Sequence, residues 1–304
     1  MKLAVASSSE VSLPVLNFLA NNKYELELVI TNPDKATGRG RVITPNAVSA
    51  WCAENKIPVS KPSNEQELLA IFNQNNIDLL ITVAYGHILK AELLSKPKFG
   101  AINLHYSLLP KYRGAAPVQH AILNGDKKTG VTVFKLDAGM DSGPIYVQQE
   151  IEIKSSETTP QLIARLNIIG VDLIEKTLKM ISEGVQPEAQ PEANITFAPK
   201  FRKSDGEVNW QSTSEKIFNQ YRALGSNPGV YTTHNEIKIK ISTMKEESTE
   251  ILAPGVFSVV DESLLVGTKT NDLRIDYLIP EGRKVMSGKD FFNGLQEKAQ
   301  SSFA

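Results

Sequence analysis

The chain has 304 residues, of which 41% are hydrophobic and 22% charged, a balance that indicates a globular protein with enough apolar material for two cores. Its formal net charge of −1 excludes binding of nucleic acid through bulk positive charge, so any contact with RNA needs a local basic patch. A single cysteine, Cys52, excludes an intramolecular disulfide and a zinc site built from cysteines.

The sequence carries no sign of a membrane segment or of a metal site. The apolar start Met1–Ala6 is too short for the core of a signal peptide, and no stretch approaches the roughly 20 apolar residues of a membrane span. The four histidines are scattered and lack the spacing of metal ligands. We therefore expect a cytoplasmic protein with no membrane anchor and no metal.

Predicted strands and helices alternate through the first half of the chain. The hydrophobic pattern predicts strands at residues 2–6, 24–31, 77–84 and 100–104, and helices at residues 11–20, 47–54, 64–75 and 114–123. The run Asp78–Ala84 is almost entirely apolar, which is typical of a strand covered on both faces. This alternation predicts a doubly wound α/β domain with a mostly parallel sheet.

The pattern changes in the second half. Strands predicted at residues 129–137 and 145–153 precede a long helix at 159–183, whose apolar residues recur every three or four positions. Residues 184–193 are rich in Pro, Glu and Ala, as in a linker. After a helix at 214–224, short strands separated by turns predict a small antiparallel barrel. We expect domains at residues 1–183 and 205–304, joined by a linker at 184–204.

Three polar residues are placed where ligands collect in a doubly wound sheet, beyond the carboxyl ends of the strands. Asn103 and His105 end the strand predicted at residues 100–104 and point to the same side, because side chains alternate along a strand. Asp141 lies in a glycine-rich loop after the next strand. On residue types alone, Asn103 and His105 would more often cap a turn, and Asp141 would more often shape its loop.

An amide, an imidazole and a carboxylate suit the transfer of a carbonyl group between two amines. The attacking amine is itself the nucleophile, so no serine or cysteine is needed. The Asn103 amide can donate a hydrogen bond to the oxyanion. His105 can carry a proton, and Asp141 can orient the imidazole and favour its charged form.

The run Asn103–Gly114, with the sequence NLHYSLLPKYRG, resembles the Asn-x-His-x-Ser-Leu-Leu-Pro-x-aromatic-Arg-Gly signature of folate-dependent formyltransferases. The downstream run Asp137–Gly143, DAGMDSG, extends this resemblance. It implies a Rossmann-like catalytic domain followed by an OB-like barrel that binds tRNA. It also implies that Asn103, His105 and Asp141 are catalytic. The folate site that it implies consists of Ser107, Leu108, Leu109, Pro110, Val83, Ala84, Tyr85, Gly86 and Asp137.

The same resemblance implies the two substrates. The formyl donor is 10-formyltetrahydrofolate, and the acceptor is the α-amino group of methionine on initiator tRNA. The loop at residues 32–45 carries Lys35, Arg39 and Arg41 against Asp34, a net charge of +2 from 3 − 1, which suits phosphates. We therefore expect Lys35, Arg39 and Arg41 to bind tRNA, with an ordinary solvated loop as the alternative.

We expect the protein to be a monomer.

Two departures from the family pattern concern single positions. Tyr106 is bulkier than the small residue expected between the histidine and the serine, and it could reshape the wall of the pocket. After the basic loop, Pro45-Asn46-Ala47 replaces the more usual Pro-Val-Lys, so one expected lysine contact is missing.

Other functions remain to be weighed against formylation of tRNA. A formyltransferase that acts on an amino-sugar nucleotide or another small amine would use the same chemistry. A nucleotide-dependent dehydrogenase would need a glycine-rich turn after the first strand, where this chain has Ala6-Ser7-Ser8-Ser9. A non-catalytic RNA-binding protein would have no need of Asn103, His105 and Asp141.

Overall fold

The computed structural model describes residues 1–22, 24–37, 40, 42–249, 252–296 and 302–304. The chain forms two compact units. The first contains residues 1–117, 128–152 and 163–199, and the second contains residues 118–127, 153–162 and 200–304.

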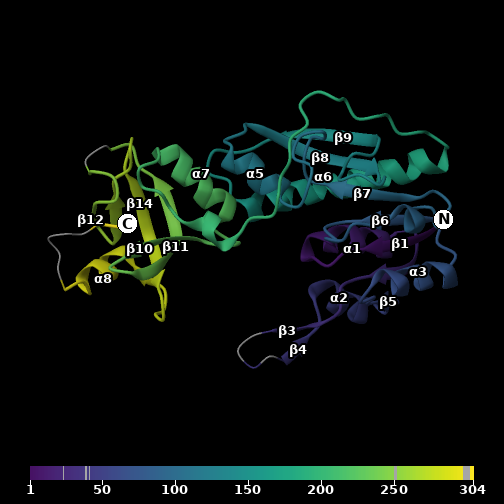
Figure 1. Ribbon diagram of the computed structural model, residues 1–304, viewed down its shortest axis with the longest axis horizontal. Helices are drawn as coiled ribbons and strands as arrows, with labels where there is room; N and C mark the ends of the chain where they lie inside the picture. The colour runs from purple at the N-terminus through teal and green to yellow at the C-terminus, as the bar shows by residue number, and fades with distance from the viewer. Residues whose placement is uncertain (23, 38–39, 41, 250–251, 297–301) are drawn as a thin grey trace. The chain divides into compact units, whose positions relative to one another are not determined.

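A seven-stranded sheet in the order β5-β2-β1-β6-β7-β8-β9 forms the centre of the first unit (Figure 1). Its strands are β1 (Lys2–Ala6), β2 (Glu25–Ile30), β5 (Val59–Ser60), β6 (Leu79–Thr82), β7 (Ala101–His105), β8 (Lys128–Lys135) and β9 (Ile145–Glu152). Strands β5, β2, β1, β6 and β7 pair in parallel, and β8 pairs antiparallel with β7 and β9. The predicted mostly parallel sheet is confirmed.

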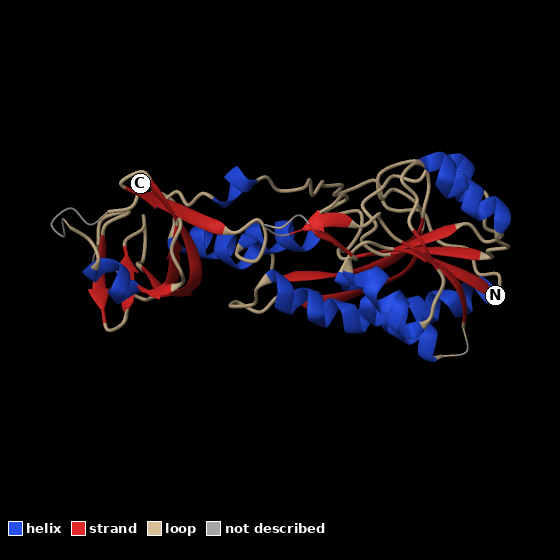
Figure 2. Ribbon diagram, turned by 90° about the horizontal axis from the view of Figure 1, so that it is seen from below, coloured by secondary structure: helices blue, strands red, loops and turns tan. Residues whose placement is uncertain are grey.

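Helices flank both faces of this sheet, as Figure 2 shows. Those of the first unit are η1 (Glu10–Ser12), α1 (Leu13–Asn21), α2 (Ala47–Asn55), α3 (Glu65–Gln74), α4 (Ala91–Leu94) and most of α6 (Thr159–Ser182). Asn46 and Asn64 begin α2 and α3 by accepting backbone N–H groups of the first turn. Helix α5 (Pro117–Leu123) begins three residues later than expected, with proline in its first turn.

The core of the first unit is tight where α6 crosses β7. A Cβ atom at Gly170 of α6 would lie 2.9 Å from the Leu104 side chain of β7, so glycine permits the close approach of helix and strand. Tyr106 is also buried, and its hydroxyl donates to Asn167 Oδ1 of α6 at 2.6 Å. Tyr106 therefore packs against α6, and the expectation that it reshapes the pocket wall finds no support in these contacts.

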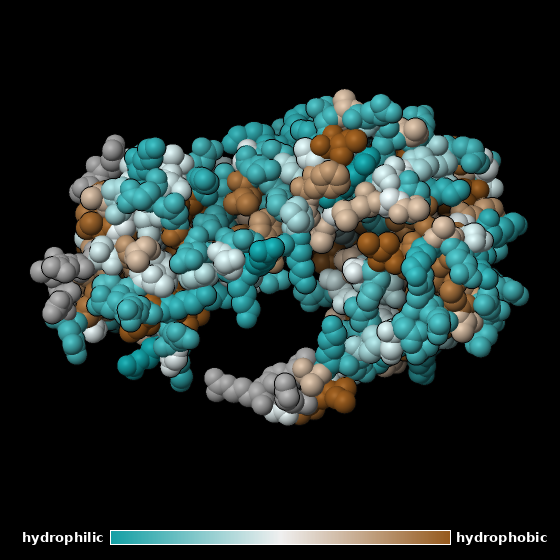
Figure 3. All heavy atoms as spheres, viewed as in Figure 1, coloured by the Kyte–Doolittle hydropathy of each residue, from teal (hydrophilic) through white to brown (hydrophobic). Residues whose placement is uncertain are grey.

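The basic segment at residues 32–45 contains a two-stranded antiparallel ribbon, β3 (Lys35–Thr37) and β4 (Val42–Thr44), where only a loop was expected. Lys35 is exposed on β3, whereas Arg39 and Arg41 lie outside the described residues. Val42 and Ile43 are 68% and 71% exposed, and Figure 3 shows hydrophobic surface on this ribbon. The ribbon escaped prediction because three-residue strands are too short to show an alternating pattern.

The second unit contains an antiparallel sheet, in the order β10-β11-β14-β13-β12 with β15 paired to β14. Its strands are β10 (Val230–His234), β11 (Ile237–Glu246), β12 (Phe257–Val260), β13 (Ser263–Val266), β14 (Leu273–Pro280) and β15 (Met286–Ser287). Its helices include η2 (Lys203–Gly206), α7 (Ser214–Leu224) and α8 (Gly288–Asn293). Buried aromatic rings of Trp210, Phe257, Phe291 and Phe303 pack together in its core. The expected change to a separate antiparallel β unit is confirmed.

None of the helices in the described ranges, including the 24-residue α6, is both long and apolar enough to cross a membrane.

Candidate active site

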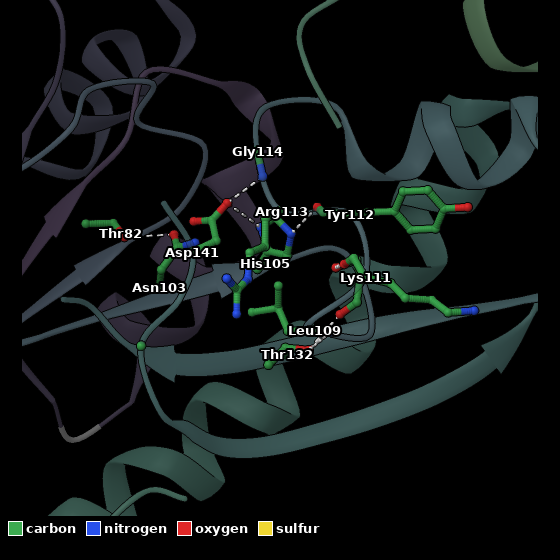
Figure 4. Close-up of polar contacts among 12 residues, drawn as sticks. Thr82, Asn103, His105, Leu109, Lys111, Tyr112, Arg113, Gly114, Thr132 and Asp141 are labelled. Carbon is green, nitrogen blue, oxygen red and sulfur yellow. Dashed lines mark hydrogen bonds and ion pairs between the residues drawn. The ribbon is translucent and has the colours of Figure 1, made fainter. Parts of the chain in front are cut away.

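Asn103 and His105 lie at the carboxyl end of β7, where the parallel part of the sheet ends. Thr82, at the end of the neighbouring strand β6, is the register partner of Asn103. Its hydroxyl donates to Asn103 Oδ1 at 2.8 Å (Figure 4). Because the amide oxygen of Asn103 is held by Thr82, the amide NH₂ group faces the opposite way and is available as a donor.

The His105 side chain is almost completely buried, and both of its ring nitrogens have polar neighbours. The carbonyl oxygen of Tyr112 lies 2.9 Å from Nε2, and the Asp141 carboxylate oxygen Oδ2 lies 3.7 Å from Nδ1. A carbonyl oxygen only accepts, so Nε2 must carry the hydrogen. In the neutral ring, Nδ1 is then unprotonated. Nδ1 faces Asp141, as Figure 4 shows.

Asp141 is held in place by the loop that joins β8 to β9. Its backbone has the left-handed value φ +49°, which a residue other than glycine rarely adopts. Its Oδ2 atom accepts the backbone N–H of Gly114 at 2.7 Å. Earlier in the same loop, the Asp137 carboxylate accepts the Gly139 N–H at 3.0 Å and the Ser142 hydroxyl at 2.9 Å. The loop therefore carries the carboxylate to within 3.7 Å of the imidazole.

Burial decides the charge of His105. Removal from water lowers the pKa of His105 below its ordinary 6.5, whereas the Asp141 carboxylate and the bond to Tyr112 oppose this shift. The sequence suggested that Asp141 would favour the charged ring. It does act in that direction, but the desolvation effect is larger. The imidazole is therefore neutral at pH 7 and can accept a proton at Nδ1.

This arrangement can assist addition of an amine to a carbonyl carbon. It offers a hydrogen-bond donor for the developing oxyanion, in the Asn103 amide, and a proton acceptor, in His105 Nδ1. Once protonated, the imidazolium is stabilised by the Asp141 carboxylate beside it.

Comparison with known proteins identifies the family. The family model described as "Formyl transferase" matches residues 1–178, and the model described as "Formyl transferase, C-terminal domain" matches residues 200–296. The chain belongs to the formyltransferase family.

Several relatives carry a more specific name. The methionyl-tRNA formyltransferase of Thermodesulfovibrio yellowstonii is 37% identical over 291 residues, which cover 94% of this chain and 93% of the relative. That of Mycobacterium sp. (strain KMS) is 37% identical over 306 residues, with 99% of each chain covered. That of Geobacter metallireducens is 35% identical, with 97% and 96% covered.

Solved structures share the fold at lower sequence identity. The sugar 3N-formyltransferase WlaRD, crystallised with dTDP and 5-N-formyl-tetrahydrofolate, has a TM-score of 0.69 at 19% identity and covers 93% of this chain and 99% of its own. An N-formyltransferase of Helicobacter canadensis, in complex with folinic acid and dTDP-3-aminofucose, has a TM-score of 0.69 at 21% identity, with 90% and 98% covered.

The signature segment of this formyltransferase, residues 107–110, is turned largely into the protein. The Ser107 hydroxyl donates to Lys111 O at 2.6 Å, and Ser107 and Leu109 are buried. The Gln148 amide donates to Leu109 O at 3.0 Å. Leu108 packs closely on Gly130 of β8. These contacts fix the path of the loop toward Gly114, and folate contact by Ser107, Leu108, Leu109 and Pro110 stays a prediction.

The other segment expected at the folate site, Val83–Gly86, follows β6. Ala84 and Gly86 have left-handed backbones, with φ +48° and +77°, which turn the chain sharply and leave both residues exposed. Tyr85 is buried and borders a hollow of about 120 Å³ that is also lined by Leu68, Ile88 and Leu93. Pockets that bind small molecules have volumes of roughly 300–1,000 Å³, so this hollow is too small for a ligand the size of folate. Folate contact by Val83, Ala84, Tyr85 and Gly86, and by Asp137, stays a prediction.

The structure also adds residues that sequence reasoning missed. Thr82 orients Asn103, the carbonyl of Tyr112 fixes the tautomer of His105, and the N–H of Gly114 holds Asp141. Thr82 lies within a predicted strand, but its pairing with Asn103 depends on the register of β6 and β7, which the sequence does not give. Within the described part of the chain, no group of three or more His, Cys, Asp or Glu side chains could hold a metal ion.

Proposed function

We propose that this formyltransferase transfers the formyl group of 10-formyltetrahydrofolate to the α-amino group of methionine on initiator tRNA. The observation that supports this acceptor most strongly is the 35–37% identity, along nearly the whole chain, to methionyl-tRNA formyltransferases. The sugar formyltransferases resemble it at only 19–21% identity, which speaks for the fold alone. We place the reaction in the cytoplasm and expect a monomeric enzyme.

The three side chains have distinct roles in this proposal. Asn103 donates its amide hydrogen to the formyl oxygen, which takes negative charge when the methionine nitrogen bonds to the formyl carbon. His105 accepts the proton that this nitrogen loses, and Asp141 stabilises the resulting imidazolium. When the bond between the formyl carbon and N10 of the folate breaks, His105 returns the proton to N10. Atoms and charges then balance, with formylmethionyl-tRNA and tetrahydrofolate as products.

Binding of the acceptor stem is assigned to Lys35, Arg39 and Arg41 of the basic segment, of which Lys35 is described and exposed. Replacement of the two arginines by alanine should raise KM for tRNA and reduce its salt dependence, because each phosphate contact releases about one counterion. Transfer to a free small amine should be unaffected.

The deciding experiment compares acceptors at equal concentration of 10-formyltetrahydrofolate. Purified enzyme is given methionyl-initiator tRNA, uncharged tRNA and an amino-sugar nucleotide, and formylated product is quantified by mass spectrometry. Formylation of the charged tRNA, at a rate far above that of the sugar, is the expected result. Activity confined to the sugar would replace the proposed acceptor and keep the reaction class.

A further inference from the structure

The segment expected to be a linker lies against the candidate active site. Glu188 pairs with Ile145 at the start of β9 through two backbone hydrogen bonds of 2.6 and 2.8 Å. Further along, Thr196 accepts the Tyr112 N–H on its hydroxyl at 2.8 Å, and Phe197 forms a β-bridge with Arg113. All these residues belong to the first unit. The segment is therefore held at two places, beside the start of β9 and beside the signature loop.

Gln190, between these two attachment points, connects the two loops that carry the catalytic groups. Its Nε2 group donates to the carbonyl oxygens of Asp141 and Gly143, each at 2.8 Å. Its Oε1 atom accepts from Arg113, at 2.6 Å from Nη2 and 3.2 Å from Nε. One amide thus joins the β8–β9 loop to the signature loop.

The requirement for an amide follows from this geometry. Two donors and one acceptor are used at once, and a carboxylate at the same place would bring negative charge against two carbonyl oxygens. The backbone that Gln190 holds is strained at Asp141, which has a left-handed φ. It is crowded at Gly143, where no Cβ atom would fit beside the Lys135 carbonyl. Hydrogen bonds from Gln190 therefore stabilise an unfavourable conformation.

We propose that Gln190 is a positioning residue for formyl transfer, which holds the Asp141 carboxylate near His105 by fixing the backbone of Asp141 and Gly143 against Arg113. This inference rests on the proposed function, because it assumes that His105 and Asp141 take part in the reaction. It adds that the segment between the two family domains forms part of the active-site scaffold. Misplacement of a catalytic group by about 1 Å can cost on the order of 10² in rate.

Two variants test the proposal, Gln190→Met and Gln190→Glu. Methionine preserves length and removes all four hydrogen bonds, whereas glutamate keeps the acceptor for Arg113 and removes both donors. We expect kcat to fall on the order of 10- to 100-fold in both, with KM for both substrates changed less than about twofold. The matched control is Gln186→Glu, since Gln186 is exposed on the same segment and its side chain, among the residues that the structure describes, bonds to Gly184 O alone.

A second readout does not depend on activity. Asp141 raises the pKa of His105, so displacement of Asp141 should lower that pKa, and an NMR titration of the four histidines would detect the change. A merely structural role for Gln190 would lower Tm while leaving both the His105 pKa and kcat per folded molecule at their wild-type values. That result would overturn the proposal.

Parallel variants separate the two possible failures. If His105→Ala and Asp141→Asn lower turnover on the order of 10²-fold or more but the Gln190 variants match the wild type, the positioning role is wrong and the proposed function stands. If His105→Ala and Asp141→Asn retain turnover, the proposed catalytic roles are wrong, and with them the basis of the positioning role.

Discussion

The charge of His105 is governed by its burial and by the Asp141 carboxylate, which act in opposite directions. Because burial lowers the pKa below 6.5, His105 loses its function as a base only when the pH falls through that lowered pKa. The acid limb of the kcat/KM profile should therefore lie below pH 6.5. Asp141→Asn removes the influence that raises the pKa, so the limb should move to lower pH, with kcat reduced about 10²- to 10⁴-fold.

The control for this prediction is Asp172→Asn, which neutralises an exposed carboxylate on α6. Steady-state kinetics from pH 4.5 to 9 would measure both variants. An acid limb that stays in place after Asp141→Asn would show that the carboxylate does not influence the essential base.

Thr82 offers a finer test of the amide at Asn103. Thr82→Val replaces the hydroxyl by a methyl group of similar size, so the Asn103 side chain loses the hydrogen bond that orients it. A bond of this kind contributes about 1 kcal/mol, and we expect kcat to fall about fivefold with KM for folate unchanged. Thr82→Ser keeps the hydroxyl and should stay close to the wild-type rate. Equal rates for the two variants would contradict the orienting role of Thr82.

Single elements show where the sequence was sufficient and where it was not. Helix α6 and strand β6 were predictable because each buries a long apolar pattern, with Leu162 and Leu166 on one face of the helix and all four residues of β6 buried. The ribbon β3–β4 was missed because, among the described residues, its strands pair only with each other and expose Val42 and Ile43. Hydrophobic periodicity arises where one face of an element is buried, so an element that buries few side chains shows no periodic pattern in the sequence.

In the candidate site, too, local features were predictable from the sequence and long-range contacts were not. Alternation along β7 placed Asn103 and His105 on one side, which is a local property of a strand. The contacts of Gln190 with Asp141 and Gly143 span 49 and 47 residues, and composition made this segment a linker. Such contacts depend on the exact path of the chain after folding, which Pro and Glu content does not specify.

The turn between β8 and β9 has no room for a side chain at Gly143. A Cβ atom at Gly143 would overlap the Lys135 carbonyl oxygen, and this strand end is also fixed by the 2.8 Å bond from Lys135 N to Pro144 O. Gly143→Ala should therefore displace the loop, lower Tm and reduce kcat by at least tenfold, about 1.4 kcal/mol or more. Ala138→Ser, at an exposed position of the same loop, is the control. Wild-type kcat in Gly143→Ala would show that the loop adapts without moving Asp141.

At the scale of the whole molecule, the chain enters the second unit three times, with residues 118–127 and 153–162 joining the stretch from residue 200 onward. Two of its three stretches therefore precede residue 183, and the domain bounds expected from the sequence stay a prediction. Arg222 of α7 connects residues 153–162 to the rest of the second unit by hydrogen bonds. The guanidinium donates to the carbonyl oxygens of Glu157 at 3.1 Å and Lys154 at 3.5 Å, and to Asn219 Oδ1.

Removal of Arg222 should destabilise this unit. Arg222 is only 6% exposed, so Arg222→Ala would remove its hydrogen bonds to Glu157, Lys154 and Asn219 and leave a cavity. We expect the free energy of unfolding to fall by about 2–5 kcal/mol. Calorimetry should show a Tm several degrees below that of the wild type, whereas Lys216→Ala, at an exposed position of the same helix, should not change it. Equal Tm values for the two variants would mean that the 153–162 stretch is held to the second unit by its packing alone.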